Sequence, residues 1–307
     1  MPPKTLPKTS EDFIHPKVFL FVLFLAMLWG GNTVSLKIGF QEFAPLASAG
    51  LRFSIGLSLI AGWALVNGIS LKPQLHEYLP LFLSAVLFVT QIVSFNWGTN
   101  LTHAGRASVM TNTYPVFVAV IAHFVVPGDR LTWWKTIGLI LAFSGILIVF
   151  RDNFAGGDRG HLAGDVLTLF GGFQLGVLII VTNRLIQHIN SYRVLTSQML
   201  IGVPIFFILS SYFEGKAGYG FSYAALFAIL YQGAVVAGFC FVGWTLILKH
   251  YSPSRLAVLF FTTPLWGITL SHFILGEPIT RGLAVGAPSV ALGIYTVNRS
   301  PSVQKQR

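Results

Sequence analysis

The chain has 307 residues, of which 54% are hydrophobic and only 10% are charged, and its mean hydropathy is +0.71. Soluble domains carry about 25% charged residues, so this composition excludes a soluble enzyme, and its hydrophobicity excludes a disordered chain. The single cysteine, Cys240, cannot form an internal disulfide or build a zinc or iron–sulfur cage. We therefore expect an integral membrane protein, with no cofactor, catalytic set or metal site.

Ten stretches are apolar over roughly the 20 residues that a helix needs to cross a bilayer. They show no strand-like alternation, which favours lipid-embedded helices over barrel strands. The tenth stretch is the shortest and contains Pro288. In chain order the expected spans are Val18–Ile38, Pro45–Val66, Tyr78–Asn100, Ala107–Val126, Thr132–Phe150, Gly164–Thr182, Val194–Phe213, Ala224–Leu248, Arg255–Leu275 and Gly282–Val297.

Basic residues between the spans set the expected orientation. With the N-terminus in the cytoplasm, the segments on that side hold more Lys and Arg than the outer segments, to which Arg106 is assigned. The positive-inside rule therefore places both termini in the cytoplasm. The net charge of +10 is spread over short loops without a basic face, which favours lipid headgroups over nucleic acid as the partner.

Landmarks recur in the same order in both halves of the chain. Each half holds five spans, and an odd number means that the second half enters the membrane from the opposite side. Inverted repeats are typical of alternating-access carriers, with the substrate site between the halves near the midplane; duplication that merely builds a stable bundle is the alternative. The matched landmarks are Arg106 with Arg255, Pro115 with Pro264, His123 with His272, Gly128-Asp129 with Gly276-Glu277, Gly138 with Gly286, Gly145 with Gly293, and 28–31 with 169–172.

The expected fold is an all-α membrane protein of ten transmembrane helices in two inverted five-helix repeats. Residues 1–17 form a cytoplasmic tail, 18–150 the first repeat, 151–162 a connecting loop, 163–297 the second repeat and 298–307 the C-terminal cytoplasmic tail.

Several short motifs together resemble the drug/metabolite transporter superfamily, EamA family. They are Leu-Trp-Gly-Gly-Asn at 28–32, Leu-Arg-Phe at 51–53, and the Gly-Asp and Gly-Glu corners, each followed by a glycine-spaced helix. Asp129 is a departure, since the second corner has the commoner Glu277. The resemblance covers about 18–297 and implies a ten-helix, two-repeat carrier of the inner membrane that moves small metabolites, often amino acids, outward.

Arg52 lies about eight residues into the second expected span, roughly 12 Å deep at 1.5 Å per residue. A charge at that depth costs on the order of 3 kcal/mol, and no carboxylate of the sequence shares the depth. Two interpretations stay open. The guanidinium attracts an anionic group of a substrate, or it bonds helix-end carbonyls and joins two helices.

Amide and aromatic side chains also fall near mid-depth. A single amide is typical of interhelical hydrogen bonding, worth about 0.6–2 kcal/mol, and a single Trp is typical of an interface anchor. Amides from five different spans, together with buried Trp and Tyr, favour a binding cavity for a small amphipathic ligand. The expected substrate-binding residues are Trp29, Asn32, Arg52, Gln91, Trp97, Asn112, Tyr114, Gln174, Gln232, Trp244, Thr262 and Trp266.

Pro115 and Pro264 occupy matched mid-span positions. Proline removes a backbone donor, so both helices are expected to kink and free a carbonyl, with Thr113 and Thr262 at hand to satisfy such groups. Paired broken helices mark binding sites or hinges in carriers, and a static kink is the alternative. We take the two prolines as hinge candidates.

Every acidic residue falls in a loop or near a span end. Proton or sodium coupling usually uses a buried carboxylate, so facilitated transport is favoured unless a histidine or backbone site takes that role. His123 and His272 lie near helix ends, where interfacial placement is the more common interpretation.

The sequence thus predicts a secondary transporter of the cytoplasmic membrane, not an enzyme, that exports amino acids or related small molecules by alternating access as a monomer or homodimer. An uptake carrier and a proton-coupled drug or metabolite antiporter remain alternatives. A channel would need a charge ring or carbonyl filter, and a structural subunit would need no cavity lined by amides. The substrate itself is not readable from the sequence.

Overall fold

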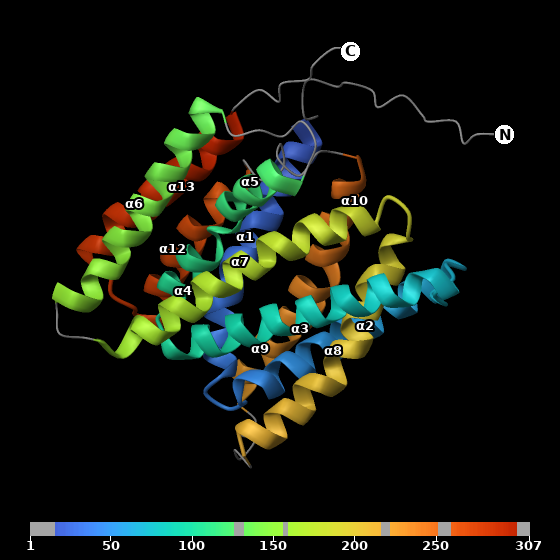
Figure 1. Cartoon of the computed structure of the whole chain (residues 1–307). Coiled ribbons are helices and arrows are strands. Elements are labelled where there is room, and N and C mark those ends of the chain that lie inside the picture. Colours follow the sequence, from blue (N-terminus) through green and yellow to red (C-terminus); the bar gives the residue numbers. More distant parts are fainter. Residues whose placement is uncertain (1–15, 126–131, 156–158, 216–221, 251–258, 300–307) are drawn as a thin grey trace, which may run out of the picture.

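The computed structural model describes residues 16–125, 132–155, 159–215, 222–250 and 259–299 (Figure 1). Within these ranges all regular structure is helical. In chain order the helices are α1 (Pro16–Gly39), α2 (Pro45–Val66), η1 (Leu75–Glu77), α3 (Tyr78–Leu101), α4 (Ala104–Thr111), α5 (Tyr114–Val125), α6 (Trp133–Ala155), η2 (Arg159–His161), α7 (Leu162–Leu185), α8 (Ser191–Phe213), α9 (Tyr223–Leu230), η3 (Tyr231–Cys240), α10 (Phe241–His250), η4 (Leu259–Thr262), α12 (Thr263–Leu275) and α13 (Arg281–Arg299).

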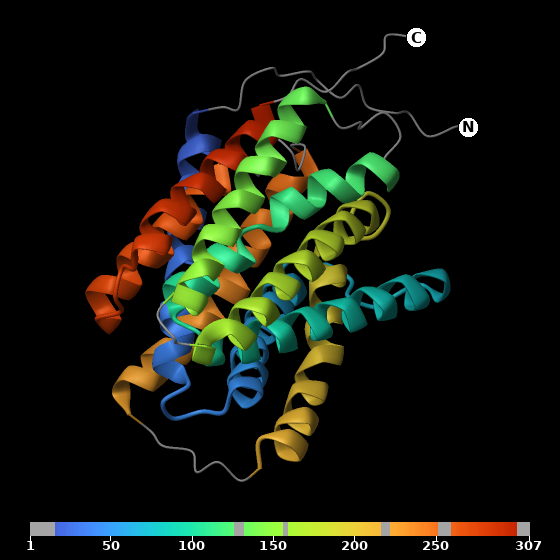
Figure 2. The ribbon, with the colours of Figure 1, turned by 60° about the vertical axis from the view of Figure 1, so that its left-hand side comes forward.

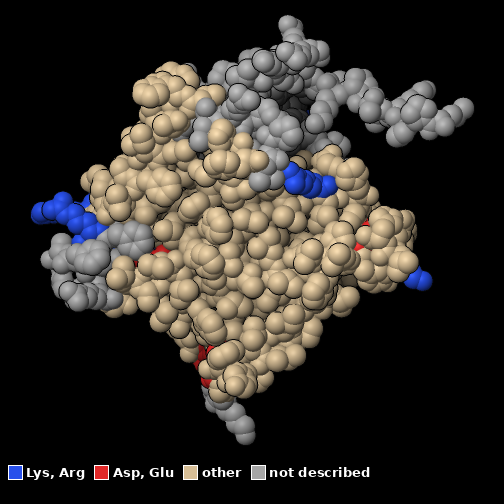
Figure 3. All heavy atoms as spheres, in the orientation of Figure 1, with Lys and Arg blue, Asp and Glu red and all other residues tan. Residues whose placement is uncertain are grey.

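Six helical stretches are long and apolar enough to cross a membrane: α1, α2, η1–α3, α7, α8 and the run from α9 into α10. They coincide with six of the ten expected spans and make this a multi-pass membrane protein. The other four expected spans are also mainly helical where the structure describes them, with a break in the fourth. The face in Figure 3 agrees, since charged side chains appear there only as small isolated patches. The landmarks Gly128, Asp129 and Arg255 lie outside the described residues.

The fourth expected span is two helices with a break between them. α4 ends at Thr111 and α5 begins at Tyr114, so Pro115 is the second residue of a new helix. At the break Thr113 Oγ1 donates to the carbonyl of Met110 at 2.6 Å, and Asn112 Nδ2 donates to that of Ser108 at 2.8 Å. These side chains replace backbone bonds that the break removes, as was predicted for Thr113.

Pro264 is likewise the second residue of α12, which follows the 3-10 turn η4. The expectation that the two prolines sit inside kinked helices was therefore wrong. The first turn of a helix has no intrahelical partner for its N–H groups, so proline is tolerated there and starts the helix. By contrast, α13 continues through Pro288.

The run from α9 to α10 contains a ten-residue π-helix, η3. A π-helix is rare, and its wider turns occur mostly at functional sites. Here it brings Gln232, Val236 and Ala237 toward the centre of the molecule, against α1 and α2.

Glycines let α6 and α13 pack backbone to backbone, and the two helices run side by side in Figures 1 and 2. A Cβ on Gly145 would lie 2.6 Å from the carbonyl oxygen of Gly286, and a Cβ on Gly286 would lie 2.6 Å from that of Gly145. A Cβ on Gly293 would meet the carbonyl of Gly138 at 2.6 Å. Exchanging each glycine for its matched glycine in the other half turns the Gly145–Gly286 contact into the Gly138–Gly293 contact. The two helices are therefore antiparallel, and their contact is reciprocal.

Two further pairs of matched helices are antiparallel in the same way. The start of α2 meets the end of α8, where Glu214 accepts hydrogen bonds from the backbone of Leu46. In the α4–α12 pair, Gly105 lies beside Ser271 and Gly267 lies beside Ser108. Unmatched helices pack reciprocally as well, since α1 lies against α12 while α7 lies against α4 and α5.

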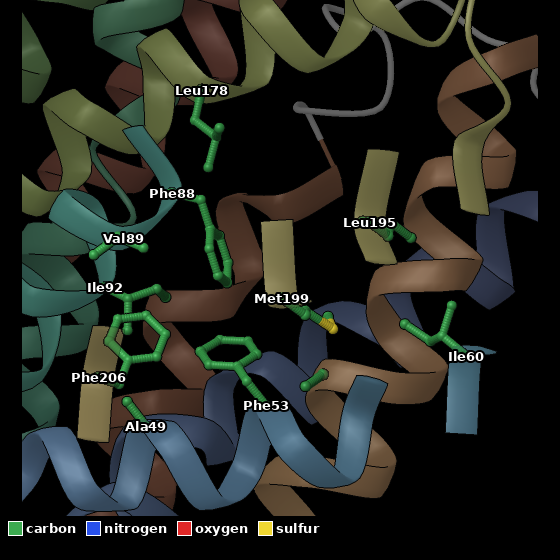
Figure 4. Packing of buried hydrophobic residues seen from close by; sticks show 11 residues of the cluster. Ala49, Phe53, Ile60, Phe88, Val89, Ile92, Leu178, Leu195, Met199 and Phe206 are labelled. Carbon is green, nitrogen blue, oxygen red and sulfur yellow. The ribbon is translucent and has the colours of Figure 1, made fainter. Parts of the chain in front are cut away.

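Aromatic rings fill the space between α2, α3 and α8 (Figure 4). Phe53 lies 4.9 Å from Phe88 and 5.8 Å from Phe206, measured between ring centroids, and all three rings are buried. Aromatic pairs at such distances contribute about 0.5–1.5 kcal/mol beyond area burial. This cluster holds α2 and α3 in place, and from these two helices Arg52 and Phe88 extend toward the centre of the molecule.

Candidate functional site

A cavity of about 170 Å³ lies at the centre of the helices. Its walls come from both halves of the chain, and most of the lining side chains are apolar. The lining residues are Trp29, Asn32, Thr33, Arg52, Phe53, Phe88, Gln91, Ile92, Phe95, Thr111, Asn112, Tyr114, Leu175, Leu178, Ile179, Thr182, Leu195, Gln198, Gln232, Val236, Ala237, Phe241, Trp244, Thr245, Leu248, Phe260 and Thr263.

The cavity extends from mid-helix toward one end of the molecule. Its furthest lining residues include Thr182, near the end of α7, Leu195, near the start of α8, and Leu248, near the end of α10. We call this the cavity end. The opposite end, where α1, α3, α8 and α12 finish and α2, α4 and α7 begin, is called the closed end.

Most of the expected binding residues line this cavity. The break between α4 and α5 presents two of them, and the π-helix presents another. The expected residues in the lining are Trp29, Asn32, Arg52, Gln91, Asn112, Tyr114, Gln232 and Trp244.

Four expected residues are not among the lining residues. Trp97 donates from Nε1 to Glu214 at 3.0 Å, at the closed end, and Trp266 is 40% exposed on α12. Gln174 is buried on α7 but does not line the cavity, and Thr262, in η4, does not line the cavity either. Depth along a helix is readable from the sequence, but the direction of a side chain around an apolar helix is not.

Arg52 is the one charged side chain among the lining residues, and it is 3% exposed. Its Nη2 donates to Asn96 Oδ1 at 3.2 Å, and Asn96 Nδ2 donates to the carbonyl of Pro45 at 2.7 Å. The guanidinium therefore joins α2 to α3 through an amide side chain, whereas the structural interpretation had named helix-end carbonyls. Its Nε has no hydrogen-bond partner among the described residues.

Three further lining residues carry buried polar atoms without a partner in the described part of the chain: Asn32 Oδ1, Thr111 Oγ1 and Thr263 Oγ1. Buried polar groups are almost always hydrogen-bonded, because leaving one unpaired costs about 1–3 kcal/mol. Four such atoms around one cavity indicate a site that is completed by a ligand or by water.

An aromatic wall closes one side of the cavity toward the cavity end. Trp244 lies 4.6 Å from Phe260 and 6.2 Å from Trp29, with Phe260 5.4 Å from Trp29, all between ring centroids. Edge-to-face rings of this kind present apolar area together with the indole N–H donors. Sequence reasoning found the tryptophans but missed Phe260, which gives no polar or positional signal.

Hydrogen bonds between helices of different halves hold the closed end. Gln232 Nε2 donates to the carbonyl of Ser35 at 3.0 Å, and Ser48 Oγ donates to Gln232 Oε1 at 3.4 Å, which ties η3 to α1 and α2. Ser35 Oγ donates to the carbonyl of Ala228 at 3.0 Å. Gln232 is fully buried, so these bonds are shielded from water.

Two glutamates accept hydrogen bonds at helix N-termini there. Glu214 accepts from Leu46 N at 2.9 Å, and Glu277 accepts from Ala104 N at 2.8 Å and from Gly105 N at 3.1 Å. A carboxylate at a helix N-terminus meets unpaired N–H groups and the positive end of the helix dipole. Each glutamate joins the end of one helix to the start of a helix in the other half.

Burial raises the pKa of Glu277, but hydrogen bonds from His103, Ala104 and Gly105 and the charge of His103 outweigh it, so the net pKa of this carboxyl lies below its ordinary value. His103 Nδ1 is 3.6 Å from Glu277 Oε1. The carboxylate form is thus the form that the closed end binds.

A buried ion pair links α4 to α7. Arg106 Nε donates to Asp165 Oδ2 at 3.1 Å and its Nη2 also pairs with that oxygen, while Thr102 Oγ1 donates to Asp165 Oδ1 at 2.7 Å. Asp165 is fully buried and Arg106 is 4% exposed. The assignment of Arg106 to an outer loop was wrong, because it lies inside α4 as the internal partner of this carboxylate.

The described acidic residues do lie near helix ends, as expected, although Asp165 and Glu77 are buried there. Glu77 pairs with Arg193 Nη1 at 2.6 Å at the cavity end. None of them lines the cavity, and the described residues contain no group of His, Cys, Asp and Glu placed to hold a metal ion. Glu11, Asp12, Asp129 and Asp158 lie outside the described residues.

Comparison with known proteins supplies the family. The sequence matches the EamA-like transporter family over residues 16–151 and again over 162–299, which together make up most of the chain. The chain belongs to this family. Its members and relatives are named as transporters, not enzymes.

Curated relatives of this EamA-family chain match it over nearly its whole length. An uncharacterized transporter of Bacillus subtilis, YoaV, is 26% identical, with 91% of this chain and 96% of the relative covered. A probable amino-acid metabolite efflux pump of Escherichia coli is 26% identical over 90% of this chain and 93% of that protein. A solved crystal structure at 16% identity superimposes with a TM-score of 0.71, covering 92% of this chain and 97% of that chain, and so shares the fold.

Proposed function

We propose that this protein is a secondary transporter that moves amino acids or related small molecules out of the cytoplasm by alternating access. The observation that carries the proposal is the central cavity, which is lined by helices of both halves and lies next to an end that hydrogen bonds between the halves keep closed. A site that reaches one side only, with its other side closed by breakable contacts, is what alternating access requires.

The architecture proposed for this mechanism is ten spans in two inverted repeats. The reciprocal Gly145–Gly286 contact and the antiparallel α2–α8 and α4–α12 pairs support it, since a two-fold axis in the membrane plane relates matched helices in this manner. Pro115 and Pro264 start the second part of each broken span, and we assign the hinges to these two breaks.

The direction of transport follows from the proposed orientation. With both termini in the cytoplasm of an inner-membrane protein, the cavity end faces the cytoplasm and the closed end faces outward. The structure then corresponds to a carrier that is ready to load a cytoplasmic solute. Export also agrees with the printed name of the Escherichia coli relative, an efflux pump.

Uncoupled transport is proposed for the same site. None of the acidic residues that the structure describes lines the cavity, and Asp165 is already paired with Arg106. An ion-coupled carrier needs a titratable or oxygen-rich site that communicates with the substrate.

The test is efflux from liposomes that contain the purified protein and a labelled mixture of amino acids and their acid derivatives, with and without a pH gradient. Trp244→Ala removes part of the cavity wall and is expected to lower efflux at least tenfold, while Trp266→Ala, which alters a side chain outside the cavity, leaves it within twofold. Both variants must elute as monodisperse protein.

Three results would contradict the proposal. Efflux that is as fast from protein-free liposomes as from liposomes with the protein would contradict the carrier function. Unitary conductance steps in a planar bilayer would identify a channel. Efflux that accelerates with a pH gradient contradicts uncoupled transport while leaving the carrier in place.

A further inference from the structure

The charge balance of the cavity is the starting point for the substrate class. Among the described residues that line the cavity, Arg52 carries the one charge, and none of the described acidic residues lines it. The described lining therefore holds one positive charge and no negative charge.

The guanidinium of Arg52 is an incompletely paired cation. It has five N–H donors, of which one is seen to bond Asn96, and its Nε has no partner in the described residues. Asn96 is neutral, so the bond orients the guanidinium but does not balance its charge. A buried charge without a counter-ion is costly, and a bound anion would remove that cost.

A carboxylate is the anion that fits this donor. Its two oxygens match the parallel N–H groups of a guanidinium, which is why Arg binds carboxylates in a bidentate manner. A larger anion such as a phosphate ester of a sugar is disfavoured, because the rest of the wall is apolar and aromatic.

The cavity also limits the rest of the ligand. An apolar cavity of about 150 Å³ accommodates benzene, so the volume of about 170 Å³ suits one ring or a branched aliphatic chain beside the carboxylate. The cluster of Trp29, Trp244 and Phe260 provides the apolar wall for such a group.

A free amino group finds no charged partner in this site. The ammonium of an amino acid would meet only neutral acceptors among the described lining residues, and the buried and unpaired ones are Asn32 Oδ1 and the hydroxyl oxygens of Thr111 and Thr263. A neutral hydroxyl can donate to one of these oxygens without bringing a second buried charge. The site with a carboxylate is electrically balanced, whereas the site with a zwitterion keeps an unpaired ammonium.

We propose that the cavity selects a monoanionic carboxylate with an aromatic or branched apolar group and no ammonium, such as the 2-hydroxy acid that corresponds to an apolar amino acid. Arg52 binds the carboxylate, and the aromatic wall holds the apolar group. This inference rests on the proposed transport function, because it names what that same cavity carries.

The test uses four probes with one common ring: 3-phenyllactate, 3-phenylpropionate, phenylalanine and phenethylamine. Efflux from proteoliposomes at pH 7.5 is measured for each, with protein-free liposomes as the blank. We expect the two carboxylates without an ammonium to move at least tenfold faster than phenylalanine, and phenethylamine not to move above the blank. Phenylalanine moving as fast as 3-phenyllactate would overturn the proposal.

Two variants test the assigned role of Arg52. Arg52→Gln keeps hydrogen-bonding groups but loses the charge, so we expect at least a tenfold loss of 3-phenyllactate efflux and a loss of the preference over phenylalanine. Arg52→Lys keeps the charge and should retain part of that preference. If Arg52→Gln keeps the preference for 3-phenyllactate over phenylalanine, the role of the guanidinium is overturned. If neither variant folds, the probe series with the wild type still tests the ligand class.

Thermal unfolding of the detergent-purified protein separates the two proposals. If 3-phenyllactate raises the unfolding temperature of the wild type and phenylalanine does not, while no probe crosses the liposome membrane, the ligand class holds and the transport function fails. If amino acids are transported and bound in preference, transport holds and the ligand class fails. If no probe is bound and no probe is transported, both proposals are contradicted.

Discussion

The two ends of the molecule are held by different mixtures of contact. At the closed end, hydrogen bonds and charges cross between the halves at several helices, with Gln232 tied to α1 and α2 and with Glu214 and Glu277 bound at helix N-termini. At the cavity end, the Glu77–Arg193 ion pair joins the start of α3 to α8, and α1 and α10 pack through a cluster of apolar side chains that includes Val22 and Val194.

This difference has a consequence for how each end changes shape. Hydrogen bonds and ion pairs are directional and fail when a helix shifts, whereas apolar contacts tolerate sliding with little loss. The closed end therefore has a defined arrangement that opens as a unit. At the cavity end, the described directional contacts join α8 to α3 and α7, through Glu77–Arg193 and Gln198, while α1 and α10 meet their neighbours through apolar packing. The predictions below test this contrast by stability measurements in detergent.

The largest effect is expected from the buried ion pair of the closed end. Arg106→Leu leaves the fully buried Asp165 without its counter-charge, and removing one member of a buried pair costs about 3–5 kcal/mol. We expect a marked fall in the midpoint of thermal unfolding, which is measured by near-UV circular dichroism.

The double variant Arg106→Leu/Asp165→Leu is the matched control. Replacing both charges by apolar groups is often neutral or stabilising, so most of the lost stability should return. A single variant as stable as the wild type would show that the charges do not hold this end.

Glu277→Gln is expected to have a smaller and pH-dependent effect. The amide still accepts a hydrogen bond from Ala104 N but loses the charge at the helix N-terminus, which is worth about 0.3–1 kcal/mol. Because the pKa of this carboxyl is lowered in the folded protein, its contribution is complete above its ordinary pKa of about 4.5 and is lost as the pH falls through the folded value.

Unfolding midpoints of wild type and Glu277→Gln measured from pH 7 to pH 3.5 check this prediction. The difference between the two proteins should stay constant down to about pH 4.5 and then shrink. A difference that grows on acidification would contradict the role given to the carboxylate.

The smallest effect is expected at the cavity end. Thr245 is buried, but its hydroxyl donates to the carbonyl of Phe241 in the same helix, so it joins no two helices. Such bonds to the preceding turn add little to helix stability, and Thr245→Val should change the unfolding free energy by less than about 0.5 kcal/mol. A loss as large as that of Glu277→Gln would remove the contrast between the two ends.

The sequence was sufficient to predict the helical membrane class and to place an irregularity in the fourth span. Length and hydropathy decide which segments cross a membrane, and Thr113 with Pro115 marked the irregularity, although the structure has a break between two helices there where a kink was expected. Mid-depth polarity also pointed to Arg52 and to amides that the structure places in one cavity.

Other features needed the packing. Trp97 and Trp266 have the right depth but point away from the cavity, because an evenly apolar helix carries no sign of its inward face. The pairing of Arg106 with Asp165 joins residues 59 positions apart and was hidden by their place near expected loops. The π-helix η3 depends on tertiary contacts and has no local sequence signature.

The reciprocal glycine contacts also constrain how the chain can change over time. Gly145 and Gly286 each face the backbone of the other, and Gly293 faces the carbonyl of Gly138. A side chain added at Gly145, Gly286 or Gly293 would clash with the backbone of the other half. A substitution there therefore requires an accompanying change in the other half. Substitutions are therefore expected to be rarer at these three glycines than at the lipid-facing residues and in the cavity.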